Sequence, residues 1–365
     1  MNTIDTSQYD KQLTDKISKV REDFAALNLP EIEVFTSEPI NFRMRAEFRI
    51  WHEGDESHYA MHLPGGSRPI PIQEFPIGST RIGELMPRLM TGIKDNELLR
   101  RKLYVVEFLT TLSGDALITL IYHKPLDDQW QNEARALSTK LGAPIIGRSK
   151  KQKVVLERDY VIEELDVLGN KYRYKQVETG FTQPNAGVNQ KMLGWAVETS
   201  RNLSPERQGG DLLELYCGNG NFTLPLAQNF ERVLATEISK ISVNSSQWSM
   251  KENGVDNIEI VRMSSEDFTD ALNKVRPFRR LNNVDLDSYN FSTVFVDPPR
   301  AGLDDGTVEL VRGFDNILYI SCNPETMKNN LEALQDTHEI AKFAAFDQFP
   351  YTHHLECGAL LVKRT

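Results

Sequence analysis

The chain has 365 residues, of which 40% are apolar, 26% charged and 9% aromatic, and its formal net charge is −10. This length suggests two domains, and the composition excludes wholesale disorder, collagen-like repeats and a long coiled coil. No stretch approaches the roughly 18 apolar residues of a membrane span, and the polar, acidic opening segment is unlike a secretory signal. Three cysteines without a CxxC pair argue against a disulfide framework, a metal site and an iron–sulfur cluster, so we expect a protein of the reducing cytosol.

The opening residues predict an amphipathic helix, because apolar side chains recur at steps of three and four from Tyr9 to Phe24. Short strands and two helices are then expected up to about residue 178, which indicates a mixed α+β domain. The predicted strands are Phe48–Trp51, Tyr104–Leu109, Ala116–Tyr122 and Val154–Leu156, and the predicted helices lie near Gly83–Met90 and Asp128–Leu141.

The charge is unevenly distributed between the two halves of the chain. Residues 1–180 carry a net charge of −2, and the remainder carries −8. Because phosphate contacts need Lys and Arg, the net charge of −10 argues against assigning a nucleic-acid-binding function from charge alone, and a phosphate-binding face, if there is one, is expected in the first half. The basic clusters there are Arg43, Arg45 and Arg49, followed by Arg148, Lys150, Lys151 and Lys153.

The stretch 179–185, with sequence TGFTQPN, reads as a junction before a new helix, whose buried stripe includes Val188, Met192 and Trp195. We therefore divide the chain into an N-terminal domain, residues 1–180, and a C-terminal domain, residues 181–365.

In the C-terminal domain, short apolar strands alternate with helical segments, which is typical of a parallel, doubly wound α/β sheet of the Rossmann type. Ligands of such sheets bind beyond the carboxyl ends of the strands. The predicted strands are Leu212–Leu215, Arg232–Ala235, Ile258–Arg262, Thr293–Val296 and Ile317–Ile320.

Two of these strand ends suggest a nucleoside cofactor. The first strand ends in a turn with Gly218 and Gly220, which taken alone is equally well explained as an ordinary strand–helix turn. The second strand ends at Glu237, where a carboxylate suits the two ribose hydroxyls. Because the chain has no phosphate-binding GxxxxGK[ST] loop, S-adenosylmethionine is the leading candidate.

The fourth strand leads into Asp297-Pro298-Pro299-Arg300, a rigid turn that holds a carboxylate at the cofactor edge. An amino-methyltransferase would be expected to carry an aromatic residue after the prolines. Arg300 at that position disfavours this class of enzyme.

The fifth strand leads into Cys322, which precedes a predicted helix with Asn323 as N-cap and Pro324 as its first residue. A thiol at a helix N-terminus is expected to have a lowered pKa, so we favour Cys322 as a nucleophile over an inert packing residue. Cys217 lies in the glycine turn without a following N-cap, and Cys357 precedes an apolar stretch that indicates packing.

Glu356 lies between apolar neighbours just before the last predicted strand. A carboxyl group in such surroundings is expected to have a raised pKa, which suits proton removal. His353 and His354 are interpreted as loop residues, because two adjacent histidines alone make a poor metal site.

Together these motifs resemble those of the S-adenosylmethionine-dependent RNA 5-methyluridine methyltransferases, and most of all the tRNA branch that modifies uridine 54 in the T-loop. The resemblance covers nearly the whole chain, and ISCNPET with HLECG is its most specific part. The rRNA-modifying relatives carry an N-terminal cysteine cluster for an iron–sulfur centre, and this chain has no cysteine before Cys217. The matching segments are FRMRAEFRIWH, FTQPN, LELYCGNGNF, VFVDPPRAGL, ISCNPET and FDQFPYTHHLECG.

The resemblance implies roles for individual residues. Cys322 matches the family's nucleophile and Glu356 its general base. The cofactor-binding positions of the family fall on Gln183, Tyr216, Asn221, Glu237 and Asp297. Arg49 and Tyr104 look like contacts to the T-loop, with Arg43 and Arg45 as phosphate partners. The implied partners are the tRNA T-arm and the equivalent loop of tmRNA, and neither a membrane nor an obligate protein partner is implied.

Two alternatives stay open at this stage. An RNA cytosine-5 methyltransferase would use the same thiolate addition, but it would need a proton donor to cytosine N3 and usually a Pro-Cys motif, whereas here the order is Cys-Asn-Pro. A tRNA-binding folding factor would act by opening the RNA elbow. A Rossmann-like module that only binds would leave both Cys322 and Glu356 unexplained.

Overall fold

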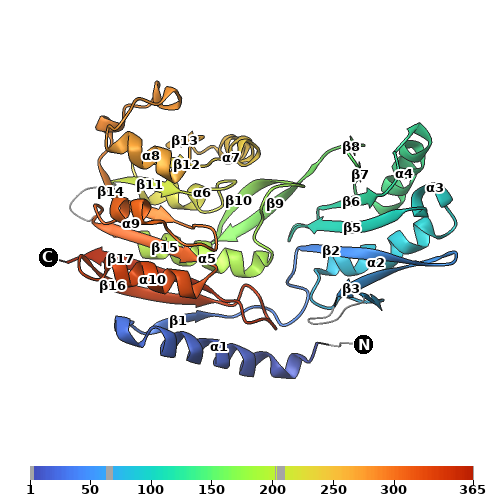
Figure 1. Cartoon of the computed structure of the whole chain (residues 1–365), viewed down its shortest axis with the longest axis horizontal. Coiled ribbons are helices and arrows are strands. Elements are labelled where there is room, and N and C mark those ends of the chain that lie inside the picture. Colours follow the sequence, from blue (N-terminus) through green and yellow to red (C-terminus); the bar gives the residue numbers. More distant parts are fainter. Residues whose placement is uncertain (1–3, 63–68, 202, 204–209, 365) are drawn as a thin grey trace. The chain divides into compact units, whose positions relative to one another are not determined.

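The computed structural model describes residues 4–62, 69–201, 203 and 210–364 (Figure 1). The chain forms two compact units, neither of which is continuous in sequence. Unit 1 comprises Met1–Thr6, Glu38–Glu164 and Gln176–Ala186, and unit 2 comprises Ser7–Ser37, Leu165–Lys175 and Gly187–Thr365. The predicted boundary at residue 180 falls in the segment that ends unit 1, whereas the opening helix belongs to unit 2.

Unit 1 is built on a seven-stranded sheet with the strand order β4-β3-β2-β5-β6-β7-β8. All neighbouring strands are antiparallel except β6 and β7, which are parallel. The strands are β2 (Arg45–Glu53), β3 (Glu56–His62), β4 (Pro69–Ile72), β5 (Leu103–Thr110), β6 (Ala116–Tyr122), β7 (Ile145–Ser149) and β8 (Gln152–Val155).

Three helices, α2 (Thr80–Lys94), α3 (Glu97–Arg100) and α4 (Asp128–Leu141), supply the apolar side chains that cover one face of this sheet. Alternation along β2 places Ala46, Phe48 and Ile50 in that core and leaves Arg49 exposed. This combination of a largely antiparallel sheet and helices is consistent with the predicted mixed α+β domain. A separate two-stranded sheet is formed by β9 (Tyr160–Val167) and β10 (Asn170–Val177).

Unit 2 contains an eight-stranded sheet with the order β1-β16-β17-β15-β14-β11-β12-β13. The predicted parallel arrangement is confirmed for β11 to β15, while β17 runs antiparallel to both of its neighbours. The strands are β1 (Ile32–Phe35), β11 (Asp211–Leu215), β12 (Val233–Thr236), β13 (Ile258–Val261), β14 (Phe291–Val296), β15 (Asn316–Ser321), β16 (His338–Phe346) and β17 (Glu356–Lys363).

Helices cover both faces of the unit 2 sheet. The larger core contains apolar side chains of α1 (Tyr9–Asp23), α8 (Ser265–Leu272), α9 (Asp305–Val311) and α10 (Pro324–Leu334). On the opposite face, Trp195 of α5 (Ala186–Ser200) lies against Gly358 of β17, where an added Cβ would meet the indole ring at 2.8 Å. The remaining helices are α6 (Thr223–Leu226) and α7 (Lys240–Asn253), and among the described helices none is long and apolar enough to cross a membrane.

Candidate active site

The carboxyl ends of the parallel strands bring most of the predicted site residues to one edge of the unit 2 sheet. The glycine turn follows β11, and Glu237 follows β12. Asp297 follows β14, and Cys322 follows β15. These four strands are consecutive in the sheet, in the order β15-β14-β11-β12, so the residues that directly follow them lie along the same edge of the sheet.

The turn after β11 depends on left-handed backbone conformations. Gly218 and Gly220 have φ angles of +58° and +82°, and Tyr216 adopts φ +63° although it carries a side chain. Gly220 is also sterically constrained, because a Cβ there would lie 3.1 Å from the Ser246 Cβ. Beside Gly218, by contrast, an added Cβ would meet no atom within 4 Å. The turn therefore exposes backbone at Gly218 while packing tightly at Gly220.

Glu237 ties this turn to the next helix. The Gly218 N–H donates to Glu237 Oε2 at 2.9 Å, and the Ser239 N–H donates to Oε1 at 2.6 Å. Ser239 in turn caps α7 by accepting the Ser242 N–H. The carboxylate is thereby fixed in orientation, and each of its oxygens retains a lone pair for a further donor.

Tyr216 and Asn221 lie on either side of the glycines and are both held by other side chains. The Tyr216 hydroxyl donates to Ser265 Oγ at 2.7 Å. Asn221 and Asn189 of α5 form two reciprocal amide hydrogen bonds, each of 2.9 Å. The Asn221 carbonyl also accepts the Tyr174 hydroxyl at 3.0 Å.

Cys322 lies at the N-terminus of α10, as predicted. Asn323 accepts the Glu325 N–H with its side chain, and Pro324 is the first helical residue. The Asn323 side chain also donates to the Arg300 carbonyl at 2.9 Å, and so does the Thr326 hydroxyl at 3.2 Å. The loop that follows Asp297 is thereby attached to the helix that carries the thiol.

The sheet register brings Cys322 and Glu356 to adjacent chain ends. Ser321 of β15 pairs with Cys357 of β17 in antiparallel register, so Cys322 and Glu356 are the next two opposed positions. Residues that are 34 positions apart in sequence thus become neighbours across two strands. Glu356 is only 3% exposed, whereas Cys322 is partly exposed.

The prediction that the helix N-terminus lowers the pKa of Cys322 is wrong. Burial, together with the carboxyl groups of Glu356 and Asp297, raises the pKa of the Cys322 thiol to about 11, and Arg300 offsets only part of this effect. Desolvation and two nearby acidic groups disfavour the thiolate more than the helix dipole and the Arg300 guanidinium favour it.

Three carboxyl groups surround this edge, and burial raises the pKa of each. The pKa of Glu356 lies well above its usual range because of burial and the Asp297 charge, as sequence reasoning predicted. Burial raises the pKa of Asp297 to about 7. Burial, with a contribution from Asp297, raises that of Glu214 to about 8. Sequence reasoning missed Glu214, although a charged residue between two leucines of a buried strand was visible.

Two of the predicted RNA-binding arginines in unit 1 make hydrogen bonds within that unit. Arg45 donates from Nη1 to the Gly180 carbonyl at 2.8 Å and from Nη2 to the Glu178 carbonyl at 2.5 Å. Arg43 donates from Nε to the Arg45 carbonyl at 2.9 Å. A phosphate contact by either side chain must therefore use N–H groups outside these bonds.

The second basic cluster is also partly engaged. Arg148 and Lys153 both pair with the buried carboxylate of Glu178, each at 3.2 Å. Lys150 and Lys151 are exposed in the turn between β7 and β8. The part of this cluster that is open to a polyanion is therefore the turn rather than the strands.

Arg49 and Tyr104 are brought together on adjacent strands of unit 1. The Arg49 guanidinium carbon lies 5.4 Å from the centre of the Tyr104 ring, and the His123 ring stacks on Tyr104 at 4.1 Å with an interplanar angle of 24°. His123, which follows β6, was not singled out from the sequence because no local motif surrounds it. The three side chains form a cationic and aromatic group of the kind that stacks on exposed bases.

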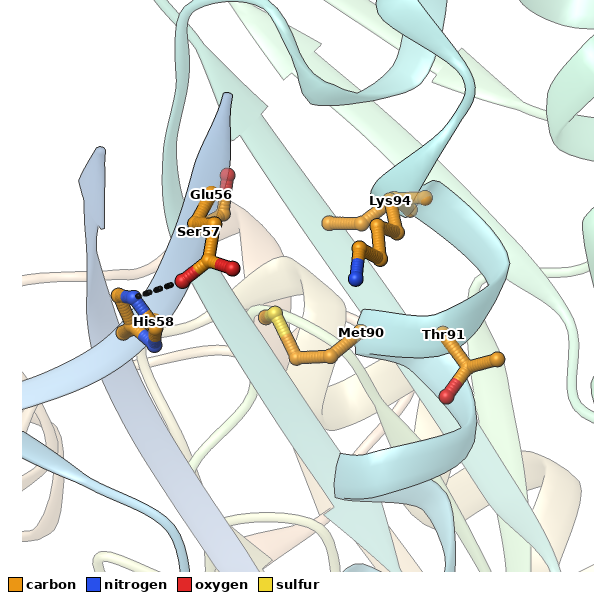
Figure 2. A pocket seen from close by; sticks show the side chains of 7 residues that line it. Glu56, Ser57, His58, Met90, Thr91 and Lys94 are labelled. Carbon is orange, nitrogen blue, oxygen red and sulfur yellow. Dashed lines mark ion pairs between the residues drawn. The ribbon is translucent and has the colours of Figure 1, made fainter. Parts of the chain in front are cut away.

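Gln183 belongs to unit 1, whereas the other four predicted cofactor residues belong to unit 2. The cofactor contacts of all five residues stay predictions. Unit 1 also contains a cavity of about 210 Å³, lined by residues that include Glu56, His58, Met90 and Lys94 (Figure 2). Its single ion pair, His58 with Glu56 at 3.5 Å, involves no predicted site residue, and the described residues contain no cluster suited to a metal ion.

The strand order with one antiparallel strand near the edge, the glycine turn and the acidic residue after β12 define a Rossmann-like methyltransferase. Comparison with known proteins identifies the family within this class. The family model for tRNA (Uracil-5-)-methyltransferase matches residues 8–364, and the chain belongs to this family.

Relatives of high identity match nearly the whole chain. The tRNA/tmRNA (uracil-C(5))-methyltransferase of Cellvibrio japonicus is 60% identical, over 98% of this chain and 97% of the relative. The protein of the same name from Saccharophagus degradans is 56% identical over the same shares. The fold is similar to that of the Pyrococcus abyssi tRNA (uracil-54, C5)-methyltransferase crystallised with S-adenosyl-L-homocysteine, with a TM-score of 0.71, 23% identity, and coverage of 97% of this chain and 83% of that chain.

Proposed function

We propose that this protein methylates C5 of uridine 54 in the T-loop of tRNA, and the equivalent uridine of tmRNA, with S-adenosylmethionine as methyl donor. Membership of the tRNA (Uracil-5-)-methyltransferase family supports this activity, as do the names of relatives 56–60% identical. The observation that carries the chemistry is the opposition of Cys322 and Glu356 at the carboxyl edge of the sheet. We place the reaction in the cytoplasm, because tRNA is the substrate.

The residues at the edge of unit 2 fit S-adenosylmethionine. Open space lies beside Gly218, and the fixed carboxylate of Glu237 retains acceptor capacity for ribose hydroxyls. When bound, the cofactor supplies an electrophilic methyl group. The residues proposed to hold it are Gln183, Tyr216, Asn221, Glu237 and Asp297.

The proposed chemistry uses Cys322 first. Uracil C5 is a weak nucleophile, so direct methylation is slow. The Cys322 thiolate forms a bond to C6, the C5–C6 π bond opens, and its electron pair is delocalised over C5 and the C4 carbonyl oxygen. This turns C5 into an enolate carbon that can accept the methyl group.

Glu356 acts second. After methylation, C5 carries both the new methyl group and its original hydrogen. Glu356 removes this proton, the C5–C6 double bond re-forms, and the bond from C6 to the Cys322 sulfur breaks and returns the thiolate. The burial that raises the pKa of Glu356 also makes the carboxylate a stronger base than an exposed carboxylate.

Unit 1 is the proposed RNA-binding domain, within an N-terminal domain that the sequence places at residues 1–180. Uridine 54 lies inside the folded tRNA elbow and must be flipped out before Cys322 can reach it. Tyr104 is proposed to stack on an RNA base and Arg49 to contact the T-loop, with Arg43 and Arg45 as phosphate partners. Because His123 stacks on Tyr104 and Arg49 lies over the ring in this structure, an RNA base that stacks on Tyr104 would take the place of one of these side chains.

A covalent trapping experiment tests the proposal. The protein is mixed with S-adenosylmethionine and a T-arm RNA that carries 5-fluorouridine at the target position. Because fluorine cannot leave as a cation, proton removal fails and a denaturation-resistant protein–RNA adduct accumulates. The adduct should form with the native protein and with Cys217→Ala, but not with Cys322→Ala.

Each contrary outcome has a distinct meaning. Failure of the native protein to form the adduct, with cofactor binding confirmed, would contradict the assignment of uridine as the target. An adduct with 5-fluorocytidine RNA in its place would identify a cytosine-5 methyltransferase. If Cys322→Ala still accelerated tRNA folding without methylation, the protein would also be a folding factor.

A further inference from the structure

A buried ion pair links the opening helix to the segment that precedes Glu356. Lys16 of α1 and Asp347 are separated by 2.7 Å between Nζ and Oδ1, and their side chains are 7% and 0% exposed. Both residues belong to unit 2. The two partners lie 331 positions apart in sequence. Neither residue takes part in the cofactor or RNA contacts proposed above.

Further contacts join the same two segments. The Lys16 ammonium also donates to the Phe349 carbonyl at 2.9 Å. Gln12, one helical turn earlier, donates from Nε2 to Asp347 Oδ2 at 3.2 Å and accepts the Tyr351 N–H at 3.3 Å. The rings of Tyr9 and Tyr351 meet edge to face at 6.1 Å. One face of α1 thus holds the chain at residues 347, 349 and 351.

Residues 347–355 connect β16 to β17, and Glu356 directly follows them. Phe346, the last residue of β16, pairs with Glu356, the first residue of β17. Residues 347–355 therefore close a β16–β17 hairpin whose base is the Phe346–Glu356 pair. The Asp347 N–H is fixed as well, because it donates to the Phe35 carbonyl of β1 at 3.0 Å. A shift of Asp347 would be transmitted directly to the position of Glu356.

Stability alone does not account for a buried pair at this place. Removing two charges from water is costly, and apolar side chains of similar size commonly stabilise a fold as well or better. What an ion pair with additional hydrogen bonds provides is a unique geometry. Burial disfavours the charged form of Lys16 and lowers its pKa. Keeping the lysine charged in this place therefore costs free energy.

We infer that Lys16, Gln12 and Asp347 are positioning residues, which hold the 347–355 segment so that Glu356 can remove the C5 proton. This inference rests on the proposed function and adds a specific consequence to it. The steps before proton removal depend on Cys322, which is attached to α10 and the Arg300 loop. Disturbing the α1 contacts should therefore slow proton removal and leave thiolate addition nearly intact.

The test uses the double variant Lys16→Met/Asp347→Leu, which replaces the pair by apolar side chains and leaves no unpaired buried charge. We expect turnover on ordinary T-arm RNA to fall about 10- to 100-fold, as small misplacements of a catalytic group do. The rate of adduct formation with 5-fluorouridine RNA should stay within about 3-fold of the native rate, because that rate reports only the earlier steps. A covalent adduct should also accumulate on ordinary uridine RNA.

Two further variants make the result decisive. Gln12→Ala removes the partly exposed contacts without burying a charge, and a smaller change of the same kind is expected. Arg232→Met/Asp211→Leu is the matched control: it removes a partly buried ion pair of 2.7 Å at the amino end of β11. The control should change stability without changing the ratio of the two rates.

The inference is overturned if the folded Lys16→Met/Asp347→Leu variant turns over at the native rate. It is equally overturned if adduct formation and turnover fall together, because that result identifies a general structural role. Failure of the native protein itself to form an adduct is a different result, which contradicts the proposed function.

Discussion

The raised pKa of Cys322 makes a quantitative prediction about its reactivity in the free protein. With a thiol pKa of about 11 in place of 9.0, the thiolate fraction near neutral pH is about 100-fold smaller than that of an ordinary cysteine. Each thiolate is intrinsically more nucleophilic, by roughly 10-fold for a shift of this size. Alkylation of Cys322 should therefore be about 10-fold slower than that of an exposed thiol.

The dependence on pH distinguishes this account more sharply than the rate itself. Because the pKa is raised, the thiolate is scarce below about pH 11, and the alkylation rate should rise tenfold per pH unit through pH 9 without levelling off. Glu356→Gln removes one of the charges that disfavour the thiolate, so it should move the whole curve to lower pH.

The assay is timed alkylation with iodoacetamide, followed by mass spectrometry of the peptide that contains Cys322. Cys217 and Cys357, which are 4% and 0% exposed, should react far more slowly, and Cys322→Ala gives the background. A rate that levels off below pH 9 in the folded protein would refute the reasoning. So would a Glu356→Gln curve that coincides with the native one.

Three more outcomes are expected. Gly220→Ala should lower the free energy of unfolding, measured by urea titration, by about 1–3 kcal/mol, because φ is +82° and the new Cβ would contact Ser246. Gly218→Ala should lower the free energy of unfolding by less, because no atom lies within 4 Å of the new Cβ. Glu163 is buried and its pKa is raised to about 8, so between about pH 4.5 and 8 the native state holds a proton that the unfolded state has lost. The free energy of unfolding should therefore fall as pH rises through this range, and Glu163→Gln should reduce this dependence on pH. Arg49→Ala should weaken tRNA binding with little change in the slope of log affinity against log salt, because Arg49 is proposed to contact the T-loop beside Tyr104, and a slope reduced by about 1 would instead identify Arg49 as a phosphate contact.

Features that depend on neighbouring residues in the sequence were predicted well. The helix Asp128–Leu141 and the strand Ala116–Tyr122 have the predicted bounds, because periodicity and turn residues mark both ends. The N-terminus of α10 was also predicted, since cap, proline and acidic first turn follow one another in Asn323–Glu325. Other strands shifted by one to three residues, such as β8, which spans Gln152–Val155.

Features that depend on distant pairing could not be predicted in this way. The opening helix was placed in the N-terminal domain, yet it packs in unit 2, where Phe24 meets Phe343 at 5.4 Å. β1 joins the same sheet by pairing with β16. Neither β1 nor β16 carries a local motif that identifies its partner, and β1 is only four residues long. Register between such strands is determined by tertiary packing.

The prediction of a lowered pKa for Cys322 was wrong for the same reason. The helix N-terminus is a local feature and was read from the sequence, whereas the opposing carboxyl groups of Glu356 and Asp297 come from the sheet register and from a neighbouring strand end. Reasoning from the local sequence included the helix N-terminus, which favours the thiolate, and left out burial and the two carboxyl groups, which disfavour it. The identity of the site residues was predicted from motifs, but their charge states required the fold.

The corrected charge states also give the proposed mechanism an internal order. A thiolate at Cys322 and a carboxylate at Glu356 disfavour each other, so the site resists holding both charges at once. Bond formation between the Cys322 sulfur and C6 transfers the negative charge from sulfur to the uracil ring, and methylation of C5 then neutralises it. The thiolate charge is therefore absent at the stage when Glu356 acts as the base, whereas the burial and the Asp297 charge that raise the pKa of Glu356 remain. Opposing the two groups across β15 and β17 therefore favours their use one after the other, with Cys322 acting before methylation and Glu356 after it.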